Sequence, residues 1–218
     1  FPVSELDVVT QSLLGIIQGE NVVGARELME RFPHRNVFEL TLAEIAGLTP
    51  NDPKVLEAYW IGNDSLKRAR GGDVRERLLN HYRRQKNLAP GYVENLEKIP
   101  MQQVILHHNF QVTKIGVMDT GGLDKSMAAV NNCMVRGGQV IEVGDGLVRV
   151  ELFRLSKKLF GGFKIEIEEE RVQLDVQLVA DLRAGNYVAV HWGAVAMKLS
   201  DEQGKQLEHW TREVVKSL

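Results

Sequence analysis

The sequence predicts an α+β protein in which a helical N-terminal domain, residues 1–100, is followed by a small β-barrel domain with a C-terminal helix, residues 101–218. Apolar residues recur at steps of three and four up to about residue 89, which is the spacing of amphipathic helices. From Val104 the chain is rich in β-branched residues and alternates with period two, as half-buried strands do. The helical spacing returns after Leu199.

The N-terminal domain divides into several predicted helices. Residues 4–32 carry a first apolar stripe, and we expect Pro33 to end it because proline cannot continue a helix. A second helix is predicted over 37–45. Asp52 and the proline after it predict the start of another, since aspartate caps a first turn and proline fits its first position. A further helix is predicted over 73–86.

The second domain reads as short strands separated by tight turns. Gly144-Asp145-Gly146 predicts a hairpin turn between two of them, and a short helix is predicted over 124–131. Short strands without helices between them favour a barrel over a doubly wound sheet. The predicted strands cover 103–118, 133–143, 146–155, 162–174, 187–192 and 194–199.

The chain ends in a predicted amphipathic helix. Ser200 and Gln203 have the spacing of a capping box, in which each residue satisfies a backbone N–H of the first turn. The side chains expected on the inner face are Leu207, Trp210, Val214 and Val215.

Composition and charge exclude several classes of function. The formal net charge of −2 provides no overall electrostatic attraction to nucleic acid or to an anionic membrane. No apolar run is long enough to cross a bilayer. The start lacks a signal peptide, and a single cysteine cannot form an internal disulfide, so we expect a cytoplasmic protein. The motifs of nucleotide hydrolases, thiol oxidoreductases and serine hydrolases are missing.

Two segments carry the strongest functional signal. Cys133, the only cysteine, opens the apolar run Cys-Met-Val-Arg-Gly-Gly-Gln-Val-Ile-Glu-Val, and residues 185–193 read Gly-Asn-Tyr-Val-Ala-Val-His-Trp-Gly. Together they resemble the signatures of the HypC family of small nickel–iron hydrogenase maturation chaperones, over about residues 133–218. The remainder resembles an uncharacterised bacterial family, through segments 58–63 and 107–112, to which we attach no activity.

The HypC resemblance implies a fold, a site and a partner. The fold would be a small OB-like barrel with a helical tail. Cys133 would ligate iron carrying cyanide and carbonyl groups, shared with a larger HypD-like protein or a hydrogenase large subunit, and His191 would be its neighbour. Gly138 would let the strand bend or let another backbone approach closely. A thiolate and an imidazole suit soft, low-valent iron, although a lone cysteine on an apolar strand is also typical of a structural residue.

The sequence departs from that family in three places. Its cysteine is internal, whereas the HypC cysteine follows the initiator methionine. Arg136 and Gly137 stand where an apolar residue and proline are usual, and the interval between the signatures contains a lengthened hairpin at about 154–171. These changes predict a relative with an altered cargo or partner.

Three classes of function follow in order of preference. The first is a non-enzymatic accessory protein that binds or hands over an iron fragment through Cys133 and His191. The second is a metal-free protein-binding scaffold that keeps the barrel. The third is a small metalloenzyme that adds His107 or His108 as a ligand, although on the predicted strand these two histidines point to opposite faces. Tyr59 and Trp60 are predicted core anchors, and no oligomeric state is predicted.

Overall fold

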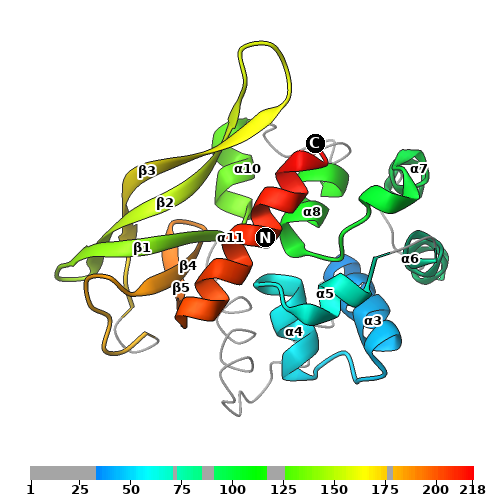
Figure 1. The fold of residues 1–218 in the computed structure, drawn as a ribbon, viewed down its shortest axis with the longest axis horizontal. Helices are drawn as coiled ribbons and strands as arrows, with labels where there is room; N and C mark the ends of the chain where they lie inside the picture. The colour runs from blue at the N-terminus through cyan, green and yellow to red at the C-terminus, as the bar shows by residue number, and fades with distance from the viewer. Residues whose placement is uncertain (1–32, 71–72, 85–90, 117–125, 176–178) are drawn as a thin grey trace. The chain divides into compact units, whose positions relative to one another are not determined.

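The computed structural model describes residues 33–70, 73–84, 91–116, 126–175 and 179–218 (Figure 1). These residues fall into two compact units, a helical unit within 33–116 and a barrel unit within 126–218. The helical region, the closed five-stranded barrel and the C-terminal helix confirm the predicted α+β class. The helix predicted over 4–32 lies outside the described residues.

The helical unit consists of short helices around a common core. Phe38, Leu42, Tyr59, Leu78 and Tyr82 are almost fully buried there. The elements are α3 (Pro33–Ala46), α4 (Pro53–Trp60), α5 (Asp64–Arg68), α6 (Val74–Arg83), α7 (Tyr92–Lys98), the 3-10 helix η1 (Met101–Gln103), α8 (His108–Phe110) and the π-helix η2 (Gln111–Gly116).

Two prolines begin helices in this unit. Asp52 caps α4 as predicted, because its carboxylate accepts a hydrogen bond from the Lys54 N–H at 2.9 Å and proline follows at the first helical position. Pro33 is the first residue of α3, and the helix that we expected it to end lies outside the described residues. A proline lacks only an N–H that the first turn leaves unpaired anyway, so it suits this start as well.

The strand predicted over 103–118 is wrong for the residues that the structure describes. Residues 108–116 form α8 and η2, and they belong to the helical unit, so the barrel unit begins later than the predicted boundary at 101. Val104, Ile105 and Leu106 are all buried, at 2, 5 and 0% exposure. A continuous apolar run of this kind does not distinguish strand from helix or loop by periodicity.

The barrel unit closes a sheet of five strands on itself. In spatial order they run β1-β2-β3-β5-β4, and β4 returns to pair with β1. The pairs are antiparallel except for β3 with β5, which meet in parallel at Gln173 and Ala194. The strands are β1 (Arg136–Val143), β2 (Leu147–Lys157), β3 (Phe163–Gln173), β4 (Tyr187–His191) and β5 (Ala194–Leu199).

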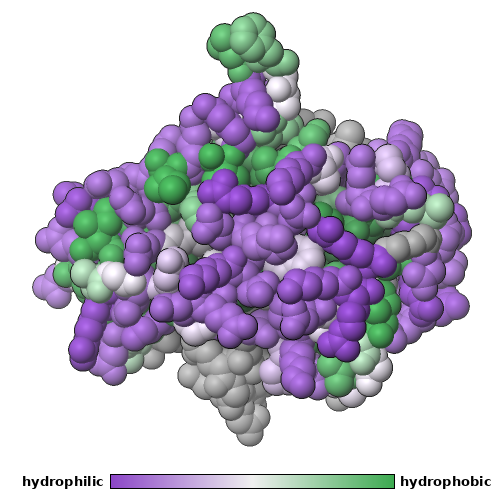
Figure 2. Space-filling model, in the orientation of Figure 1, coloured by the Kyte–Doolittle hydropathy of each residue, from purple (hydrophilic) through white to green (hydrophobic). Residues whose placement is uncertain are grey.

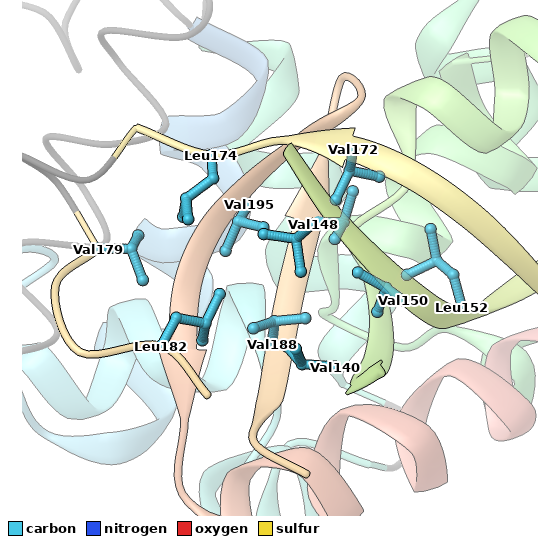
Figure 3. Packing of buried hydrophobic residues seen from close by; sticks show 11 residues of the cluster. Val140, Val148, Val150, Leu152, Val172, Leu174, Val179, Leu182, Val188 and Val195 are labelled. Carbon is cyan, nitrogen blue, oxygen red and sulfur yellow. The ribbon is translucent and has the colours of Figure 1, made fainter. Parts of the chain in front are cut away.

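Small branched side chains fill the barrel. Valine dominates this core, as expected where β-branched residues alternate inward along short strands (Figure 3). The cluster consists of Val140, Val148, Val150, Leu152, Val172, Leu174, Val179, Leu182, Val188, Val190 and Val195.

Two helices flank the barrel strands. The short helix α10 (Met127–Cys133) leads directly into β1, and α11 (Asp201–Lys216) follows β5. The capping box predicted for α11 is present in both directions between Ser200 and Gln203. Of the four predicted inward side chains of α11, three are fully buried and Val215 is half-buried.

Candidate functional site

Cys133 lies at the junction between α10 and β1. It is the last residue of the helix, and the next N–H, that of Met134, donates to the carbonyl of Val130 at 3.0 Å. The side chain is half-buried, and burial raises the pKa of the Cys133 thiol to about 11. The thiol is therefore protonated at neutral pH, whereas the nucleophilic and metal-binding form of cysteine is the thiolate.

His191 comes from a distant part of the chain and meets Cys133 directly. It is the last residue of β4 and only 4% exposed. Its Nε2 donates to the main-chain carbonyl of Cys133 at 3.1 Å. Because a carbonyl oxygen only accepts, this bond places a proton on Nε2. The structure thus brings His191 and Cys133 together, and the imidazole contacts the main chain of the cysteine.

A tight turn holds His191 in this place. His191 pairs with Ala194, so Trp192 and Gly193 form a two-residue hairpin loop, with φ angles of 52° and 75°. Positive φ at both positions matches the twist of the flanking strands. For tryptophan this left-handed conformation costs roughly 1–2 kcal/mol. The Trp192 N–H donates to the carbonyl of Asn132 at 3.1 Å, so the turn and His191 bind consecutive carbonyls at the end of α10.

Gly138 permits a close approach of two strands within the barrel. A Cβ atom at this position would lie 2.5 Å from the carbonyl oxygen of Glu151 and 2.8 Å from a methyl group of Val150. The backbone that approaches Gly138 is therefore the chain's own strand β2.

An ion pair that the sequence did not indicate lies on the core side of the strands. Arg136 is 3% exposed and donates two hydrogen bonds to Glu170, at 2.6 and 3.0 Å. Glu170 pairs directly with the core residue Val150, so the two side chains share a face of the sheet. Position 136, where the resemblance to HypC led us to expect an apolar residue, thus carries a buried cation with its own counter-charge.

His107 and His108 belong to the helical unit and adopt different environments. His107 is fully buried at the start of α8, where its Nδ1 accepts from the Asn109 N–H at 3.1 Å. His108 stacks on Trp60, with ring centroids 4.3 Å apart, and its Nδ1 lies 3.0 Å from the Tyr59 hydroxyl. Tyr59 and Trp60 are 1 and 3% exposed, which confirms them as core residues.

The protonation state of His108 follows from its partners. The Tyr59 hydroxyl donates to Oε1 of Gln111 at 2.5 Å. It then accepts from His108, so the proton of that imidazole is on Nδ1. Both histidines thus use their Nδ1 atoms to order the helical unit.

Burial of His107 predicts a pH-dependent stability. Desolvation, with the nearby His108 as a lesser cause, lowers its pKa from 6.5 to about 3. Between pH 6.5 and 3 the imidazole binds a proton in the unfolded chain but not in the folded one. The free energy of unfolding therefore has its full value above about pH 6.5 and falls as the pH decreases toward 3. The expected slope is about 1.4 kcal/mol per pH unit, or roughly 2 kcal/mol between pH 7 and pH 5.

Urea unfolding at several pH values, followed by circular dichroism, measures this slope. The variant His107→Asn removes the titrating group and keeps a residue that caps helices well. Its unfolding free energy should depend less steeply on pH than that of the native chain. Parallel curves for the two proteins would contradict the assignment.

The described residues contain no group of three or more histidine, cysteine, aspartate or glutamate side chains placed to hold a metal ion. Nor do they include a helix with the length and apolar character needed to traverse a bilayer.

Comparison with known proteins assigns the chain to a family. The family model of DUF6390, a family of unknown function, matches residues 12–218, and the chain belongs to that family. No curated protein and no solved structure matches the chain.

Proposed function

We propose that this member of the DUF6390 family is a cytoplasmic accessory protein of metalloenzyme assembly, similar to HypC and without turnover of its own. Cys133 would hold an iron fragment with cyanide and carbonyl groups, beside His191. The partner would be a HypD-like protein or a hydrogenase large subunit. The observation that supports this proposal is the 3.1 Å bond from His191 to Cys133, which joins the two segments that resemble HypC.

The site sets conditions on how iron is taken up. Binding requires the Cys133 thiol to release its proton as the sulfur–iron bond forms, and burial raises the pKa of that thiol to about 11. Loading is therefore favoured by a partner that supplies further ligands or accepts the proton. Ligation by Nε2 of His191 would break its bond to the carbonyl, so the imidazole serves more readily as a positioning neighbour.

Infrared spectroscopy of protein purified anaerobically from a hydrogenase-producing host tests the proposal. We expect bands in the cyanide and carbonyl stretching region that disappear in Cys133→Ala and weaken in His191→Ala. His209→Ala, at an exposed position on α11, is the matched control and should keep the bands. Full hydrogenase maturation in a strain that carries Cys133→Ala would contradict the role of this cysteine.

The second candidate is a metal-free protein-binding module, and one observation favours it specifically. A thiol with its pKa raised to about 11 is neutral at physiological pH, and the Nε2 atom of His191 already has an acceptor. Such a pair can act as a structural clamp between α10 and β4.

Alkylation of Cys133 with iodoacetamide as a function of pH distinguishes the two. The structural role predicts a rate at pH 8 about a hundredfold below that of a free cysteine, rising steeply above pH 10. It also predicts that Cys133→Ala retains its fold and its partner. A thiol that reacts like free cysteine at pH 8 would contradict the structural role and favour the iron-binding one.

A further inference from the structure

The hairpin of β2 and β3 extends beyond the barrel and exposes apolar side chains. Pairing of β1 with β2 ends at Leu152, so residues 153–167, here called the finger, continue without β1 (Figure 1). At its tip Leu159 and Phe160 are 92 and 96% exposed, and Ile167 further down is 59% exposed. Figure 2 shows apolar surface at the projecting tip. Large apolar side chains exposed together in this way mark an interaction site.

The finger also presents an open strand edge. The backbone N–H and C=O of Leu155 both bond to the Asn131 side chain, at 2.8 and 2.9 Å, so Leu155 exchanges no hydrogen bonds with its cross-strand partner Ile165. By the alternation of an antiparallel pair, the N–H and C=O groups of Phe163, Ile165 and Ile167 point away from β2. Among the described strands, β3 meets β5 only at Gln173, so none of them pairs with this edge at residues 163–167.

The edge sequence is complementary to itself. Residues 163–167 read Phe-Lys-Ile-Glu-Ile. When two copies are placed antiparallel about Ile165, Phe163 faces Ile167 of the second copy and Lys164 faces Glu166. Apolar side chains then meet on one face and opposite charges meet on the other, which is the pairing that stabilises antiparallel strands.

We propose that the finger is a self-association surface, on which a second copy of this chain pairs its β3 edge antiparallel about Ile165. The contact is two-fold symmetric, because each residue meets the same set in its partner. Phe163, Ile165 and Ile167 exchange their outward backbone hydrogen bonds with the second copy. This inference is independent of the role proposed for Cys133 and His191.

The tip gains protein surface in the same arrangement. The two-fold register places residues 160–162 of each copy alongside residues 168–170 of the second copy, which are all glutamates. These glutamates already bond to arginines of their own chain, Glu168 to Arg154, Glu169 to Arg149 and Glu170 to Arg136. Phe160 is therefore covered beside charges that are already paired.

The position of Ile167 favours a protein partner over a lipid surface. Ile167 lies four residues from Phe163, or about 13 Å along the strand, and remains 59% exposed. A flat membrane that touched the tip would leave it uncovered, whereas a second strand laid along the edge covers it.

Sedimentation velocity of the full chain tests the proposal through charge exchange. The native chain should show a concentration-dependent dimer. Lys164→Glu and Glu166→Lys each place like charges opposite one another twice, and each should raise the dimer dissociation constant at least about tenfold. The double exchange should restore the dimer, and an equimolar mixture of the two single variants should form it as well. A native chain that stays monomeric, or single variants that dimerise like it, would overturn the proposal.

Cysteine cross-linking in a Cys133→Ser background tests the register. Ile165→Cys puts two cysteines at the symmetry axis with Cα atoms about 5.5 Å apart, within disulfide range. Glu169→Cys, on the same edge, puts them about 26 Å apart and is the matched control. A disulfide dimer from Ile165→Cys alone supports the arrangement, and equal cross-linking of both variants would overturn it. Flotation with anionic vesicles by a chain that stays monomeric would assign the tip to membranes instead.

Discussion

Gly138→Ala should destabilise the barrel unit by about 3 kcal/mol, measured as the free energy of unfolding in urea. The alanine Cβ would lie 2.5 Å from the carbonyl oxygen of Glu151 and within 3 Å of the Val150 and Leu152 side chains. The nearest of these atoms belongs to the backbone of β2, so no rotamer change removes the overlap. Strands β1 and β2 must instead separate where both line the core.

Gly144→Ala is the matched control for this substitution. Gly144 lies in the turn at the other end of the same strand pair, and its added Cβ would find its nearest neighbour, the Leu147 carbonyl, at 3.5 Å. This is an ordinary contact, so the unfolding free energy should change by no more than about 0.5 kcal/mol. Equal losses for both variants would mean that glycine matters here for chain flexibility and not for the approach of β2.

The barrel could be predicted from the sequence because its strands follow simple local rules. Alternation places their ends within a few residues of those observed, and 194–199 is reproduced at both ends. The capping box of α11 is equally local. The strand predicted over 103–118 is wrong in its described part because the three consecutive apolar residues 104–106 carry no period. In addition, the His107 side chain caps a helix, a role that composition does not reveal.

The candidate site could be predicted only as a pair of residues. Cys133 and His191 could be recognised from their segments. The bond between them could not be predicted, because His191 bonds to a main-chain carbonyl, and every residue type has one. The bond between Arg136 and Glu170 could not be predicted because it joins residues 34 positions apart, on strands whose register the sequence does not specify. The turn at Trp192 did carry a signal, since a residue followed by glycine between two alternating strands is typical of a tight hairpin.

Asn131→Leu should cost about 4 kcal/mol of unfolding free energy, although the substituted side chain is of similar size and apolar. Asn131 is 4% exposed and donates to the carbonyls of Met127 and Leu155, at 2.7 and 2.9 Å. Its Oδ1 accepts from the Leu155 N–H at 2.8 Å. The Asn131 side chain thus pairs with the backbone of β2 beyond Leu152, where β1 no longer does. Leucine would leave the N–H and C=O of Leu155 buried without partners, at roughly 1–3 kcal/mol for each group.

Asn132→Leu is the matched control, because Asn132 is exposed and its bond to the Trp192 N–H uses only its main-chain carbonyl. It should leave the unfolding free energy nearly unchanged.

Asn131→Asp separates the two hydrogen bonds to Leu155, since a carboxylate accepts from the N–H but cannot donate to the carbonyl. An intermediate loss of unfolding free energy is expected. The same loss for Asn131→Leu and Asn132→Leu would show that α10 is joined to the barrel by its apolar contacts. A loss confined to Asn131 would mean that the helix that carries Cys133 is fixed to β2 by one amide, and that the position of the cysteine beside His191 depends on it.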